Sequence, residues 1–264
     1  MRDRMGSSAE RAWWALLVAV SAHVLPCTAF AQGGIEEIRF AISDSLMLHA
    51  DVRRSSAPAD APLIILFHQG GGDARGEYSE IAPRLIAEGY HVIAVDARGG
   101  GNRFGGRNRA LTPEGFRYCD ALAEVGAAVN LAREQDFTGP IALWGSSYSA
   151  ALVLQVAARR PAEVSAVLAF SPASGEPMAG CEAQPFLPML VRAGVATLVL
   201  RPRAELEAPA RAAQFDSIRA TGVQTYIADN GVHGSSMLAP TRVQGDTEPH
   251  WRAVLSFLEE ALRR

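Results

Sequence analysis

The chain has 264 residues, of which 48% are hydrophobic and 20% charged, and its formal net charge is −3. Such a chain can bury a substantial core, and its charge predicts no general attraction to nucleic acid. All 25 of its Lys and Arg positions are Arg, which excludes Schiff-base lysine chemistry, pyridoxal-phosphate enzymes and nucleotide binding through a P-loop lysine.

The first 31 residues have the pattern of a secretory signal peptide. Basic residues precede an apolar stretch from Ala12 to Leu25, and Ala29-Phe30-Ala31 forms an A-x-A cleavage site. The apolar stretch is shorter than the roughly 20 residues that a bilayer span needs. We therefore expect residues 1–31 to be removed and residues 32–264 to form one periplasmic or secreted domain without stable membrane insertion. An uncleaved N-terminal anchor is the alternative.

The remaining chain alternates between predicted strands and helices. Two segments with alternating apolar and polar residues, 35–42 and 46–52, predict an antiparallel hairpin at a sheet edge. The continuous apolar run 63–67 predicts a strand buried on both faces of a parallel sheet, and further strands are predicted at 91–95, 141–144, 164–170, 196–200 and 224–228. Apolar residues at helical spacing predict helices near 81–86 and over 120–134, 148–160, 208–221 and 249–262. This alternation predicts an α/β fold, with one mostly parallel sheet flanked by helices.

The pentapeptide Gly-Ser-Ser-Tyr-Ser at 145–149 joins a predicted strand to a predicted helix. A serine on such a sharp turn is the nucleophile elbow, which holds the hydroxyl above the sheet. The residues two positions before and after the serine must be small. Gly145 meets this requirement, and Ser149 stands where Gly is usual. Ser147 is therefore the predicted nucleophile.

The segment after the strand 63–67, His68 to Gly72, predicts an oxyanion loop. It resembles the His-Gly-Gly-Gly loop that lends a backbone N–H to the oxyanion hole. Gln69 replaces the first Gly, and we favour the N–H of Gln69, then that of Gly70, as the donor from this loop. The N–H of Tyr148 is the expected second donor. A glycine-rich turn without a catalytic role is the alternative.

The loop after the strand 91–95 contains Asp96 and four arginines, Arg98, Arg103, Arg107 and Arg109. These arginines could attract a carboxylate substrate. We favour a structural role, in which an Asp96–Arg98 pair supports the loop and the other arginines are solvated.

A candidate acid and a candidate histidine, which would complete a catalytic triad with Ser147, follow the last two predicted strands. Glu205 comes shortly after 196–200, with Glu207 as a competitor, and His233 follows 224–228 between two glycines. A carboxylate can hold the histidine ring in the tautomer that catalysis needs. The histidine can then take the proton of the serine as a base and later donate it as an acid. The order Ser147, Glu205, His233 is the order of the α/β-hydrolase triad.

Cleavage of the signal peptide would leave two cysteines, Cys119 and Cys181. Two cysteines in an exported protein suggest a disulfide, and both are expected near the same edge of the sheet. Two unrelated buried thiols are the alternative. No His, Cys and Asp residues are clustered at the spacing of a metal site, so we expect no metal.

Together these segments resemble an α/β-hydrolase, and most closely the dienelactone-hydrolase-like branch of that superfamily. The resemblance covers about Ile35 to Arg264, and its most specific segments are 67–71, 145–149 and 231–234. It implies a central sheet of about eight strands and no cofactor. Dienelactone hydrolases use a Cys nucleophile and an Asp acid, whereas Ser147 and a Glu stand here, which favours a general carboxylesterase. The connection between Ser171 and Ala196 is too short for a large cap.

The sequence thus predicts an exported serine hydrolase that cleaves small-molecule carboxylic esters through an acyl-enzyme. A peptidase or polyester hydrolase would use the same triad. A non-catalytic binding protein with the same fold is the alternative from a different class.

Overall fold

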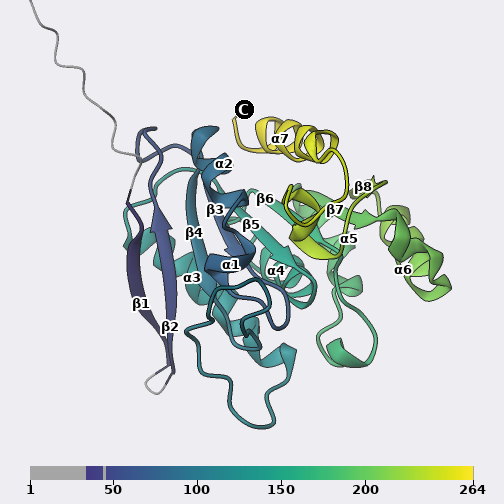
Figure 1. Ribbon diagram of the computed structural model, residues 1–264, viewed down its shortest axis with the longest axis horizontal. Helices are drawn as coiled ribbons and strands as arrows, with labels where there is room; N and C mark the ends of the chain where they lie inside the picture. The colour runs from purple at the N-terminus through teal and green to yellow at the C-terminus, as the bar shows by residue number, and fades with distance from the viewer. Residues whose placement is uncertain (1–33, 44–45, 264) are drawn as a thin grey trace, which may run out of the picture. The chain divides into compact units, whose positions relative to one another are not determined.

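The computed structural model describes residues 34–43 and 46–263 (Figure 1). The predicted signal peptide lies outside the described residues. Within the part that is described, no helix combines the length and hydrophobicity of a membrane span.

Eight strands form one sheet in the order β1-β2-β4-β3-β5-β6-β7-β8. Their bounds are β1 Glu36–Ser43, β2 Leu46–Arg53, β3 Leu63–Phe67, β4 His91–Asp96, β5 Ile141–Ser146, β6 Ala166–Phe170, β7 Ala196–Pro202 and β8 Gln224–Ala228. The hairpin β1–β2 and the pair β2–β4 are antiparallel, and every other pair is parallel. The sheet confirms the predicted fold class, including the antiparallel hairpin at the edge.

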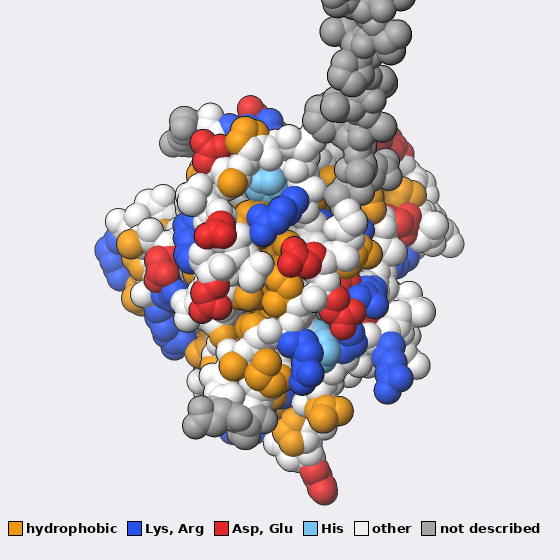
Figure 2. Space-filling model, turned by 90° about the vertical axis from the view of Figure 1, so that its left-hand side faces the viewer, with side chains coloured by type: hydrophobic (Ala, Val, Ile, Leu, Met, Phe, Trp, Pro, Cys, Tyr) orange, Lys and Arg blue, Asp and Glu red, His pale blue; other side chains and the backbone are white. Residues whose placement is uncertain are grey.

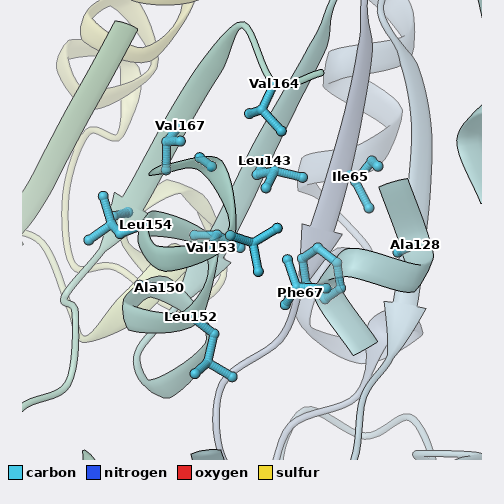
Figure 3. Close-up of a cluster of buried hydrophobic side chains, with 14 of the residues drawn as sticks. Ile65, Phe67, Ala128, Leu143, Ala150, Leu152, Val153, Leu154, Val164 and Val167 are labelled. Carbon is cyan, nitrogen blue, oxygen red and sulfur yellow. The ribbon is translucent and has the colours of Figure 1, made fainter. Parts of the chain in front are cut away.

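Helices cover both faces of this sheet because neighbouring residues of each central strand point to opposite sides. Ile65 and Phe67 of β3 pack in one apolar cluster with α3, α4, α5 and α6, and Figure 3 shows them beside Leu143, Val153 and Ala128. Ile64 and Leu66 pack in the other cluster, with α1, α2 and α7. The helix bounds are α1 Ala74–Glu77, α2 Ile81–Ala87, α3 Leu122–Glu134, α4 Tyr148–Arg159, α5 Leu187–Ala193, α6 Pro209–Ala220 and α7 Glu248–Leu262.

Charged side chains protect the exposed edge of the sheet. The edge strand β1 bears three exposed charged residues, Glu36, Glu37 and Arg39, and charges of both signs surround the apolar side chains on this face of the molecule (Figure 2). Such charges discourage pairing with the edge of another sheet.

The connection from β6 to β7 contains only short elements. Two 3₁₀ turns, Glu176–Met178 and Gln184–Phe186, precede α5. This agrees with the predicted absence of a large cap. The sequence did not predict α5, because its seven residues follow a Pro-rich segment and are too few for a helical repeat to stand out.

A disulfide joins Cys119 to Cys181, with 5.6 Å between their Cα atoms, as predicted. Cys119 lies in the 3₁₀ turn Tyr118–Ala121 that precedes α3. The bond therefore links the start of α3 to the connection after β6.

Candidate active site

Ser147 stands on a strained turn between β5 and α4. Its backbone has φ 61° and ψ −115°, a region that residues other than Gly rarely adopt and that marks functional sites. A Cβ on Gly145 would lie 2.5 Å from the carbonyl oxygen of Ser149, so only Gly fits two positions before the serine. These are the features of a nucleophile elbow.

Ser149 takes the place of the usual Gly without disturbing this turn. Its Oγ accepts the Ser146 N–H at 2.8 Å and lies 2.7 Å from the carbonyl oxygen of Phe67. The side chain is buried, and its hydrogen bonds connect the elbow to the end of β3. The departure from Gly therefore adds a connection between two adjacent strand ends.

Glu205 and His233 are in direct contact. Glu205 Oε1 lies 2.5 Å from His233 Nδ1, and Arg201 donates to Glu205 Oε2 at 2.7 Å. Glu205 is 8% exposed, whereas 46% of the His233 side chain is exposed. The competitor Glu207 is exposed at the end of the same 3₁₀ turn, Arg203–Glu207. The structure thus pairs Glu205 rather than Glu207 with the histidine.

The charge of Glu205 is stabilised despite its burial. Burial acts to raise the pKa of this carboxyl, but the hydrogen bond and charge of His233, together with the charge of Arg201, outweigh it and lower the pKa. Glu205 is therefore a carboxylate at neutral pH and can favour the tautomer in which Nδ1 carries the hydrogen.

Backbone contacts hold the loop of His233 against the elbow. Ser235 N–H donates to Ser146 Oγ at 3.0 Å, and Gly234 N–H donates to Ser171 Oγ at 3.1 Å. A Cβ on Gly234 would collide with Ser146 Oγ, and its φ of +70° also favours Gly. Among the described residues no hydrogen bond joins Ser147 Oγ to His233. Catalytic hydrogen bonds are often long without substrate and tighten when it binds.

The oxyanion loop presents one free amide. Gln69 N–H, the donor that the sequence favoured, is engaged with Glu77 Oε2 at 2.8 Å. Gly71 N–H donates to Gly99 and Gly72 N–H to Gln69, while Gly70 N–H makes no hydrogen bond within the described chain. The second expected donor, Tyr148 N–H, opens α4, where amides have no partner inside the helix.

His68 orients this loop. Its Nε2 accepts the Ala97 N–H at 3.0 Å, which assigns the ring hydrogen to Nδ1, and Nδ1–H donates to the Gln69 carbonyl at 2.9 Å. The ring is fully buried. His68 thus fixes the carbonyl of Gln69.

Glu77 is a site residue that sequence reasoning missed. It has no exposed surface, and burial raises its pKa against the lowering effects of the Ser146 hydroxyl and the Gln69 amide. A Glu in a four-residue helix looks like a solvated surface residue in the sequence. Only the fold shows that it lies beneath both the oxyanion loop and the elbow.

The arginines of the loop after β4 are paired differently from our prediction. Arg98 Nε bonds Glu124, and Asp96 bonds Arg109 Nε at 2.6 Å, so the predicted Asp96–Arg98 pair is wrong. The reason is that Glu124, in the first turn of α3, reaches back to the Arg98 backbone as well as its side chain. Arg98 keeps its predicted structural role with a different partner, but the prediction that Arg109 is solvated is wrong, because it bonds the buried carboxylates of Asp96 and Asp51.

Two cavities border His233. One, of about 550 Å³, is lined by Gln69, Arg103, Phe104, Val232, His233, Ser236 and Arg242. The other, of about 560 Å³, is lined by Pro202, Ala204, Glu205, Arg211, Gly231, Val232 and His233. Within the described ranges no group of His, Cys, Asp and Glu side chains is arranged to hold a metal ion.

Comparison with known proteins defines the family. A family model described as serine aminopeptidase, S33, matches residues 59–239, more than half of the chain. The chain therefore belongs to this family of serine hydrolases in the α/β-hydrolase superfamily. Membership in an enzyme family favours catalysis over the alternative of a non-catalytic binding protein.

One curated relative is the quorum-quenching protein AidA of Acinetobacter baumannii, 29% identical over 118 residues. The match covers 44% of this chain and 37% of the relative, so the two proteins share only part of their lengths.

Solved structures of hydrolases share the fold at low identity. An esterase of Pyrococcus furiosus is 12% identical, with a TM-score of 0.65 over 87% of this chain and 92% of its own. Est1E of Butyrivibrio proteoclasticus with ferulic acid bound is 15% identical, with a TM-score of 0.65 over 86% and 100% of the two chains. A dienelactone hydrolase of Anabaena variabilis is 15% identical, with a TM-score of 0.65 over 88% and 100%.

Proposed function

We propose that the protein is an exported carboxylester hydrolase in which Ser147, His233 and Glu205 form the catalytic triad. The observation that carries the proposal is the 2.5 Å contact between Glu205 and His233, on a loop that is hydrogen-bonded to the residue before Ser147. A carboxylate, an imidazole and a strained serine on adjacent loops match the requirements of nucleophilic acyl transfer.

In this mechanism His233 Nε2 takes the proton of Ser147 Oγ, and the oxygen attacks the ester carbonyl carbon. The bond to the alcohol oxygen then breaks as His233 returns the proton to that oxygen, which leaves an acyl-serine. A water molecule, deprotonated by His233, attacks the acyl carbon. The bond from that carbon to Ser147 Oγ then breaks, and His233 returns the proton to Oγ as the acid leaves. Glu205 stabilises the imidazolium that forms in each half-reaction.

We propose the N–H groups of Gly70 and Tyr148 as the donors of the oxyanion hole. The alternative donor, Gln69, is disfavoured because its hydrogen is already shared with Glu77. Such donors stabilise the charge that develops on the carbonyl oxygen, and each is typically worth roughly 10²–10³ in rate.

A peptidase is the second candidate, because the matching family model is described as serine aminopeptidase. An aminopeptidase has to bind the positively charged α-amino group of its substrate. The cavity shared by His233 and Gln69 instead contains two guanidinium groups, from Arg103 and Arg242. Their charge disfavours a substrate ammonium, and we therefore favour esters.

Export of the domain 32–264 is part of the proposal. The Cys119–Cys181 disulfide supports it, because disulfides persist in oxidising compartments and are rare in the cytosol. Fractionation of expressing cells and N-terminal sequencing of the mature protein test it. A first residue of Gln32 is expected, and an intact leader would contradict cleavage.

The test of the activity is hydrolysis of p-nitrophenyl acetate by purified protein and by Ser147→Ala. We expect the variant to lose at least about 10³-fold in kcat, as in other serine triads. Ser165→Ala, at a surface position that precedes β6, should match the wild type. Equal rates for wild type and Ser147→Ala would refute the proposal, and faster cleavage of aminoacyl p-nitroanilides than of esters would favour the peptidase.

A further inference from the structure

Tyr118 contacts both of the residues whose amides we propose as oxyanion donors. Its ring stacks on the ring of Tyr148, with 4.4 Å between centroids and 17° between planes. Its hydroxyl contacts Gly70, because a Cβ built on Gly70 would lie 2.5 Å from the Tyr118 oxygen. One side chain, from a segment after β4, thus contacts both residues.

The Tyr118 hydroxyl makes no hydrogen bond with any other described residue. Nearby tyrosines differ in this respect: Tyr148 donates to the carbonyl of Arg98 at 2.7 Å, and Tyr78 donates to the carbonyl of Phe67 at 2.6 Å. Tyr118 is also only partly buried. A phenol has one hydrogen to donate, and that of Tyr118 is available to a bound molecule.

We propose that the Tyr118 hydroxyl is a third donor of the oxyanion hole, beside the N–H groups of Gly70 and Tyr148. This inference rests on the proposed function. The hydroxyl lies against Gly70, so it can donate its hydrogen to the carbonyl oxygen as negative charge forms there. Donors that are oriented before reaction contribute without reorganisation.

The disulfide supports this placement from the adjacent residue. Cys119 follows Tyr118 and is bonded to Cys181, and Arg117 donates to the carbonyl of Ala179 at 2.6 Å. Both neighbours of Tyr118 are therefore anchored to the connection after β6. The ring is restrained by its stacking on Tyr148, and the main chain on either side of it is held by these two side-chain links.

The variant Tyr118→Phe tests the proposal because it keeps the stacked ring and removes only the hydroxyl. We expect kcat for p-nitrophenyl acetate to fall by roughly 10²-fold with KM changed less than about two-fold, as for other lost oxyanion donors. Affinity for a phenylboronic acid, whose serine adduct places an oxygen in the oxyanion hole, should fall by a similar factor. Tyr90→Phe, which alters a buried ring in the other apolar cluster, is the matched control and should leave both quantities unchanged.

The outcomes separate this inference from the proposed function. Activity that is lost in Ser147→Ala but unchanged in Tyr118→Phe would overturn the third donor and leave the triad standing. An increase in KM with constant kcat would also overturn it, because that result would mean that the Tyr118 hydroxyl helps to bind substrate but does not stabilise the transition state. Activity that survives Ser147→Ala would overturn the proposed function itself. Thermal unfolding and circular dichroism verify that Tyr118→Phe is folded like the wild type.

Discussion

Gln69 donates its backbone N–H to the buried carboxyl group of Glu77 at 2.8 Å. The same carboxyl lies near the hydroxyl of Ser146, which in turn accepts the N–H of Ser235. Glu77 therefore lies at the junction of the oxyanion loop, the elbow and the loop of His233. Because Glu77 accepts the N–H of Gln69, that amide is not available to substrate, whereas the next amide of the loop, that of Gly70, is free within the described chain.

Removal of the Glu77 carboxyl should reduce activity, although this carboxyl does not contact substrate and acts only by positioning the oxyanion loop. Glu77→Ala leaves the buried Gln69 N–H without an acceptor, which costs about 1–3 kcal/mol of stability. We expect kcat to fall at least about ten-fold, and Glu77→Gln, which keeps an acceptor oxygen, to recover part of the loss. Steady-state kinetics and urea unfolding measure the two effects. Glu88→Ala, at an exposed position after α2, is the control, and equal kcat in Glu77→Ala and Glu88→Ala would contradict the positioning role.

The Glu205 carboxylate should stabilise the fold only while it is charged. Its pKa is lowered in the folded protein, so its contribution is present above the ordinary Glu pKa of about 4.3 and is lost as pH falls through the folded value. The difference in unfolding free energy between wild type and Glu205→Gln should thus be constant near neutral pH and shrink in acid. Urea unfolding of both proteins from about pH 3 to 7 measures it, and a difference that grows on acidification would contradict the assigned direction.

Arg109 should be the most important arginine of the loop after β4 for stability. It bonds both Asp96 and Asp51, and each carboxylate is almost completely buried. Arg109→Met leaves Asp96 without its charged partner, whereas Asp51 keeps Arg75, and breaking a buried pair costs about 3–5 kcal/mol. Arg107→Met, at an exposed position in the same loop, should change stability by less than about 0.5 kcal/mol. Comparable denaturation midpoints for the two variants would show that the network contributes little.

The disulfide should contribute to global stability. It closes a loop of 62 residues in sequence separation, and cross-links of this kind typically contribute about 2–4 kcal/mol, mainly by restricting the unfolded chain. Reduction of the wild type and the double variant Cys119→Ala/Cys181→Ala should lower the melting temperature to the same extent as each other. Reductant should have no further effect on the double variant, and an unchanged melting temperature in wild type after verified reduction would contradict this expectation.

Much of the fold could be predicted from the sequence because the relevant signals are local. The apolar run that forms β3 matches the strand bounds in the structure, since a strand buried on both faces leaves few polar residues to blur its ends. Ser147 and Gly145 were identifiable because the elbow restricts both the backbone and the size of the side chain.

The parts that escaped prediction depend on contacts between distant segments. The partner of Asp96 is Arg109 rather than Arg98, and nothing in the spacing of the loop distinguishes the two. The bond between Gln69 and Glu77 requires α1 to fold beneath the oxyanion loop. Both contacts follow from the path of a loop, and hydrophobic periodicity carries no information about such paths.

Covalent labelling with a fluorophosphonate probe, followed by peptide mapping, tests the central claim most directly, because only an activated serine reacts with such a probe. The account predicts one adduct, on the peptide that contains Ser147, with labelling abolished in Ser147→Ala and strongly slowed in His233→Ala. An adduct on another serine, or equal labelling of wild type and His233→Ala, would contradict a nucleophile activated by this histidine.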